Sequence, residues 1–87
     1  MKYRYVERME EIFSADAREE LDRLLAGDGP RPAADVYERL YVAMEVRNTY
    51  YGEKHKSVAD FLRHGGYSEE QIARFRAMRK EEENARP

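Results

Sequence analysis

The chain of 87 residues contains no cysteine and no tryptophan. Without cysteine, a disulfide framework and a thiolate metal site are excluded, and the composition does not require an oxidising compartment. A membrane-spanning helix needs about 20 consecutive apolar residues, and no segment approaches that length. The first residues also lack the apolar stretch of a secretory signal. We therefore expect a cytoplasmic protein that does not insert into a membrane.

Groups that carry catalysis are also scarce. The chain has two histidines, His55 and His64, and its serines are mostly accounted for as helix caps. Asp60 and His64 lie four residues apart and could share a metal ion, but this spacing is more typical of an ion pair on a helix surface, and no third ligand stands at a suitable distance. We expect no enzymatic activity, no cofactor and no metal site.

Charged residues are abundant, and the apolar residues between them recur at the spacing of a helix. Asp, Glu, Lys and Arg make up 39% of the chain, whereas average proteins have roughly 25%. The hydrophobic share of 41% is ordinary, and this mixture suits amphipathic helices with charged outer faces. The composition therefore favours an all-α protein.

A first helix is predicted from Val6 to Leu25, because the apolar residues there recur at steps of three or four. Within it, Ser14 or Asp16 could cap a new helix start. The sequence therefore leaves open whether this helix is continuous or broken near Ser14–Asp16.

A second helix is predicted from about Pro32 to Tyr51. It follows a loop with two glycines and two prolines at residues 27–32, and proline is suited to a first helical turn. Gly52 is placed to end this helix, because glycine tolerates the left-handed conformation found just after a helix.

The segment after residue 56 predicts a helix-turn-helix corner. Ser57 with Asp60, and Ser68 with Gln71, have the spacing of reciprocal helix caps, and a double glycine stands between them. Helices should then cover about residues 58–64 and 69–83. The predicted fold is a small all-α bundle of four helices, with one domain at residues 1–80 and a frayed tail at 81–87.

The predicted second helix carries two apolar stripes, although one stripe is enough for a helix at the edge of a small bundle. The helix therefore either passes through the centre of the bundle, or its second stripe meets another chain. Seven tyrosines in a chain without tryptophan favour an interface, because tyrosine suits surfaces that are both apolar and wet. The interface candidates are Val36, Ala43, Val46, Arg47, Tyr50 and Tyr51.

Charge is divided along the chain. Residues 1–53 carry a net charge of −4, residues 54–80 carry +4, and residues 81–87 carry −2. The basic segment could face a polyanion, or it could neutralise its own neighbours after folding. The candidates for a polyanion contact are Arg63, Arg74, Arg76, Arg79 and Lys80.

The corner departs from the pattern of helix-turn-helix proteins that read DNA. Leu62 is bulky at a place where close helix approach requires a small residue. Glu69 and Glu70 begin the helix that would enter the groove, and they would repel phosphate.

The functional expectation is therefore a small interaction, regulatory or inhibitor protein that docks on a larger protein or forms a homodimer. Bacterial and phage-encoded regulators of macromolecular machines offer an analogy of size and class alone. A nucleic-acid-binding module that uses residues 57–80 is the alternative. A helical accessory subunit of a larger complex is a third interpretation.

Overall fold

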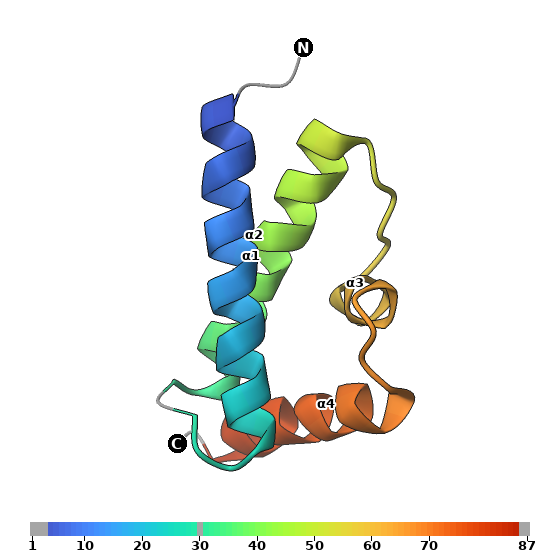
Figure 1. Cartoon of the computed structure of the whole chain (residues 1–87). Helices are drawn as coiled ribbons and strands as arrows, with labels where there is room; N and C mark the ends of the chain where they lie inside the picture. Colours follow the sequence, from blue (N-terminus) through green and yellow to red (C-terminus); the bar gives the residue numbers. More distant parts are fainter. Residues whose placement is uncertain (1–3, 30, 86–87) are drawn as a thin grey trace.

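The protein folds as an all-α bundle. The computed structural model describes the backbone of residues 4–29 and 31–85 and the side chains of residues 14–29 and 31–85. Within those ranges there are four helices and no strand, in the order α1 (Arg4–Leu25), α2 (Ala33–Tyr51), α3 (Val58–His64) and α4 (Glu69–Asn84). Helices α1 and α2 run antiparallel side by side, and α4 crosses their base (Figure 1). The predicted four-helix bundle is confirmed.

Helix α1 is continuous through the point where the sequence left a break open. Ser14 lies inside the helix and is buried, so it does not cap a new start. The buried face continues beyond it through Ala17, Leu21 and Leu25, which pack in the core. An unbroken helix keeps this face in register with α2, whereas a kink would turn part of it toward solvent.

The core lies where α2 faces the other three helices. Leu21, Val36 and Leu40 are the largest side chains that are completely enclosed. Ala33 and Ala43 are equally buried and let neighbouring helices approach closely. Helix α2 is therefore the central helix, which explains why its sequence carries two apolar stripes.

The two ends of α2 are stabilised differently. Gly52 adopts a left-handed conformation, with φ at 71°, and ends the helix as predicted. At the start, Pro32 offers no side-chain cap. Glu82 of α4 takes over this role, because its carboxylate accepts hydrogen bonds from the backbone N–H groups of Ala33 and Ala34, the latter at 3.0 Å. The last turns of α4 are thereby fastened to the beginning of α2.

The domain boundary at residue 80 stays a prediction, although α4 itself runs past it to Asn84. Of the tail predicted to fray, residues 86–87 lie outside the described part of the chain. Residues 81–84 are helical, and Glu82 contributes the cap described above.

The corner between α3 and α4 has both predicted serine caps. The Ser68 hydroxyl accepts from the Gln71 amide at 3.1 Å, and the Gln71 side chain accepts from the Ser68 amide at 2.9 Å, which completes a capping box. The Ser57 hydroxyl likewise accepts from the Asp60 amide at 3.2 Å. The reciprocal bond predicted for Asp60 was wrong, because its carboxylate pairs with Arg63 at 2.7 Å instead.

In the turn between α3 and α4, Gly66 sets the path of the backbone and Tyr67 bonds to α1. Gly66 has φ at 97°, a conformation that residues with a side chain rarely adopt. The Tyr67 hydroxyl donates to the Asp22 carboxylate on α1 at 2.8 Å. Burial, and then the bond to Asp22, raise the pKa of Tyr67, so the phenol stays a hydrogen-bond donor at neutral pH.

Ser68→Ala is expected to lower the free energy of unfolding by about 1 kcal/mol, because it removes a helix cap. Chemical denaturation followed by circular dichroism measures this change. Ser68→Asp should retain most of the stability, because aspartate is also a good cap and its charge suits a helix N-terminus. Equal midpoints for all three proteins would show that the cap contributes nothing.

Candidate functional site

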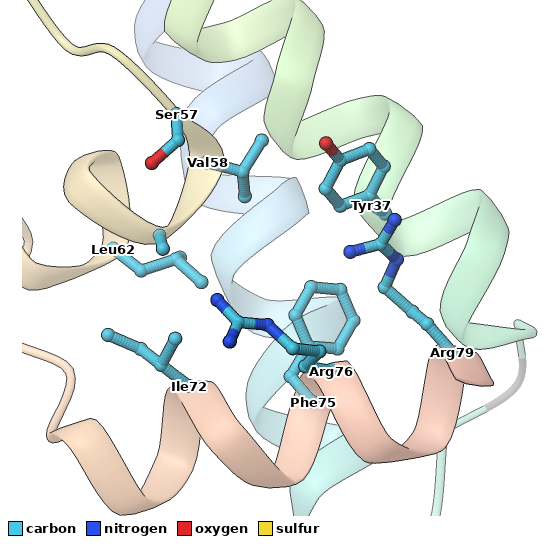
Figure 2. Close-up of a pocket in the computed structure, with 9 residues that line it drawn as sticks. Tyr37, Ser57, Val58, Leu62, Ile72, Phe75, Arg76 and Arg79 are labelled. Atoms are coloured by element: carbon cyan, nitrogen blue, oxygen red, sulfur yellow. The ribbon is translucent and has the colours of Figure 1, made fainter. Parts of the chain in front are cut away.

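Helices α2, α3 and α4 meet around a solvent-open hollow of about 130 Å³, which we call the three-helix hollow (Figure 2). Apolar side chains from α3 and α4 form its base, and polar groups contribute about as much of its exposed lining. Polar and charged groups from α2, from α4 and from the residue that caps α3 stand around its mouth. The complete lining is Tyr37, Ser57, Val58, Ala59, Leu62, Ile72, Phe75, Arg76 and Arg79.

The spacing of residues along α4 explains this arrangement. Residues 72, 75, 76 and 79 are separated by three, one and three positions, so they lie on one side of the helix. Ile72 and Phe75 are buried and form the apolar wall. Arg76 and Arg79 project from the same side toward the hollow (Figure 2).

Arg79 is held in place by an aromatic ring. The guanidinium carbon lies 3.5 Å from the centroid of the Tyr37 ring on α2, and the Arg79 side chain is half-buried. Tyr37 in turn packs beside Phe75, with ring centroids 6.5 Å apart. A cation–π contact orients the guanidinium but does not neutralise its charge. Arg79 therefore presents an oriented positive charge at the mouth of the hollow.

Neither Arg76 nor Arg79 forms an ion pair with a carboxylate from the described residues. Glu69, in the first turn of α4, is bonded to Arg63 instead. Its pKa is lowered first by that bond, and Arg76 adds only a smaller attraction. Within the described residues, the two arginines therefore have no directly bonded carboxylate, although Arg79 also borders a second depression with Glu82 and Glu83.

The segment that leads into α3 is fixed by side chains of α2. The Asn48 side-chain amide makes two hydrogen bonds of 3.0 Å to the backbone of His55, one as donor and one as acceptor. Glu53 bonds Arg47 at 2.7 Å and the His55 ring at 2.6 Å. The bond to Arg47, reinforced by His55, lowers the pKa of Glu53 to about 2. These contacts determine where α3 begins and so position the wall that it contributes.

The structure separates the polyanion candidates. Arg76 and Arg79 line the three-helix hollow, whereas Arg74 borders a different depression beside Asp22 and Glu70. Arg63 is paired with two carboxylates, and Lys80 is exposed but lines neither depression. Of these five residues, only Arg76 and Arg79 line the three-helix hollow.

The interface candidates on α2 are also divided, and two of them need correction. Val36 and Ala43 are 1% and 0% exposed and line no hollow, so they belong to the core. Val46, Arg47 and Tyr51 are half-buried, and Tyr50 is 54% exposed. For these four an interface stays a prediction. Tyr41 and Val42, which the sequence analysis did not select, are large exposed apolar residues on the same helix.

In the described ranges, no three His, Asp or Glu side chains come together in a way that could hold a metal ion. Asp60 and His64, which could have shared a metal ion, have different partners. Asp60 bonds Arg63, and the His64 ring packs against the His55 ring with their centroids 5.2 Å apart. No described helix is both long and apolar enough to cross a bilayer.

Comparison of the chain with protein-family models, curated proteins and solved structures finds no match.

Proposed function

We propose that this chain is a small, non-enzymatic protein-interaction module that docks on a larger protein and seats one of its apolar side chains in the three-helix hollow. The observation that carries the proposal is a hollow with apolar side chains at its base and two arginines at its mouth that form no ion pair with the other described residues. In this proposal the protein acts in the cytoplasm as a regulator or inhibitor of its partner.

The size of the hollow supports a side chain over a small molecule. Sites for cofactors and drug-sized ligands have volumes of roughly 300–1,000 Å³. The three-helix hollow has about 130 Å³, which is small for such a ligand but sufficient for a single side chain. An apolar centre bordered by polar groups is also the usual arrangement at an energetically important point of a protein interface.

The charge distribution favours a protein partner over nucleic acid. A duplex is held by many phosphate contacts along a continuous basic surface, whereas here Arg63 is already paired with two carboxylates and only two arginines line the hollow. Glu69 and Glu70 stand in the first turn of α4, and the whole chain has a net charge of −2. A long polyanion would meet repulsion on several sides.

The proposal is tested by filling the hollow. Ala59 on α3 is half-buried and lines it, so Ala59→Met should occupy part of the space. Ala73→Met is the matched control, because Ala73 is exposed on α4 and does not line the hollow. Thermal unfolding followed by circular dichroism checks that both variants fold. Ala59→Gln, with a flexible polar chain, replaces Ala59→Met if the latter is unstable.

The measurement is affinity capture from extracts of the cells that express the chain, with quantitative mass spectrometry. We expect a specific protein to be retained by the wild type and by Ala73→Met, and its retention to fall about tenfold with Ala59→Met, equivalent to about 1.4 kcal/mol of binding free energy. Equal retention by both variants, or no specific protein on the wild type, would overturn the proposal. Retention that disappears after nuclease treatment would favour the nucleic-acid alternative.

A further inference from the structure

The chemistry around the three-helix hollow also indicates what kind of segment it accepts, an inference that rests on the proposed function. An occupant must place an apolar group against the base of the hollow, where Leu62, Ile72 and Phe75 expose only small parts of their side chains. It must also satisfy the two positive charges at the mouth, Arg76 and Arg79. Because the two arginines border the hollow, the occupant must carry its apolar group and its negative charges close together.

The guanidinium of Arg79 is oriented so that it can bind a carboxylate. Stacking on Tyr37 at 3.5 Å occupies one face of the guanidinium plane, and its N–H groups lie in that plane. A planar guanidinium matches the two oxygens of a carboxylate in a fork of parallel hydrogen bonds. Because Arg79 is half-buried, such a bond is less screened by water than one on an open surface.

Other arginines of the chain already have such partners. Arg31 and Arg39 both reach Glu20, at 2.8 and 3.4 Å, and Arg47 reaches Glu53 at 2.7 Å. At the three-helix hollow, Arg76 and Arg79 form no such ion pair with the other described residues, although Glu82 and Glu83 border a second depression beside Arg79. A partner that brings both carboxylates and an apolar side chain would complement both features.

We propose that the three-helix hollow recognises an acidic peptide segment of the partner, in which one leucine-sized side chain enters the hollow and neighbouring carboxylates pair with Arg76 and Arg79. Acidic residues on both sides of the apolar residue can reach the two arginines whichever way the peptide runs across the hollow. A phosphate group would also suit a guanidinium, so the experiment includes a phosphorylated peptide as a separate arm.

The test is an NMR titration of the ¹⁵N-labelled full chain with the peptide acetyl-Glu-Glu-Leu-Glu-Glu-amide. Two control peptides replace all four glutamates by glutamine, or the leucine by alanine. We expect chemical shift changes concentrated at residues 57–62 and 72–79, and affinity at least about tenfold weaker for each control peptide. A fourth peptide, with phosphoserine in place of the glutamates, should bind no more tightly than the first.

A matched pair of protein variants locates the charge contact. Arg76→Gln should weaken the acidic peptide several-fold, whereas Arg74→Gln should leave the affinity unchanged, because both arginines are exposed on α4 but only Arg76 lines the hollow. Added salt should weaken binding of the acidic peptide and not of the glutamine peptide.

Several results would overturn the acidic preference. They are shift changes at other helices, equal affinity for the glutamine peptide, equal loss with Arg74→Gln, tighter binding of the phosphorylated peptide, or no binding at millimolar concentration. If cellular capture still depends on Ala59, the interaction module stands and only its preference for an acidic segment is wrong. If capture does not depend on Ala59, the module itself is wrong, whatever the peptides show.

Discussion

Leu40→Ala is expected to lower the free energy of unfolding by about 2–5 kcal/mol. Leu40 is 0% exposed at the middle of α2, the helix that contacts all three others. Truncation removes buried methyl groups and leaves a cavity that helices on several sides cannot all close. Small domains have total stabilities of about 5–15 kcal/mol, and those of this size lie at the lower end, so the variant should be partly unfolded at moderate temperature.

Val42→Ala is the control for this substitution. Val42 lies two residues further along α2 and is 49% exposed, so its truncation should change stability by less than about 0.5 kcal/mol. Urea denaturation of both variants, followed by circular dichroism, gives the comparison. A loss at Val42 as large as that at Leu40 would mean that the outer face of α2 is covered, for instance by a second copy of the chain.

Glu82→Gln is expected to cost about 1–2 kcal/mol, because hydrogen bonds to charged groups contribute about 1.5–3 kcal/mol and glutamine retains one acceptor oxygen. The wild-type carboxylate accepts from two of the first N–H groups of α2, which have no other cap. Its negative charge also interacts favourably with the positive end of the α2 dipole, and glutamine loses that attraction.

Glu81→Gln serves as the comparison, because Glu81 is exposed on the same turn of α4 and its side chain does not reach α2. The two variants are compared by thermal unfolding at low and high salt. The difference between them should shrink as salt screens the charge on Glu82. If both lose the same stability, the cap at the start of α2 is not supplied by Glu82.

Features encoded within a few neighbouring residues were predictable from the sequence. The Ser68 capping box and the left-handed Gly52 each depend on a span of about one helical turn, and both are confirmed. The continuity of α1 was not decided in this way, because Ser14 can serve as a cap or as an internal residue. Burial of its side chain against the rest of the bundle, a property of the tertiary structure, decides between the two.

Contacts between distant residues were missed for a physical reason. Glu82 stands in an acidic run at the end of the chain, and such a run is usually solvated. One signal did exist, because Pro32 lacks a side-chain acceptor and the first N–H groups of α2 therefore need one from elsewhere. The sequence could show this need, but it could not show which carboxylate meets it.

The candidate site was predictable only in part. Arg76 and Arg79 were selected for their charge, but only the packing of α4 against Tyr37 and α3 separates them from Arg74. The stripe that contains Val36 and Ala43 was ambiguous, because periodicity identifies an apolar face without saying what covers it. The central position of α2 decides that these two residues are core.

The hydrogen bonds that hold α4 against α1 and α2 affect the order in which the protein folds. Its bonds to the rest of the bundle, Tyr67 to Asp22 and Glu82 to the start of α2, join residues 45 to 49 positions apart. Helices α1 and α2 are joined by a short loop and can pair early, whereas closing these long loops costs more chain entropy. Docking of α4 should then be a late event, so that loosening either bond mainly accelerates unfolding and leaves the folding rate nearly unchanged. The walls of the three-helix hollow would be the last part of the molecule to assemble and the first to open.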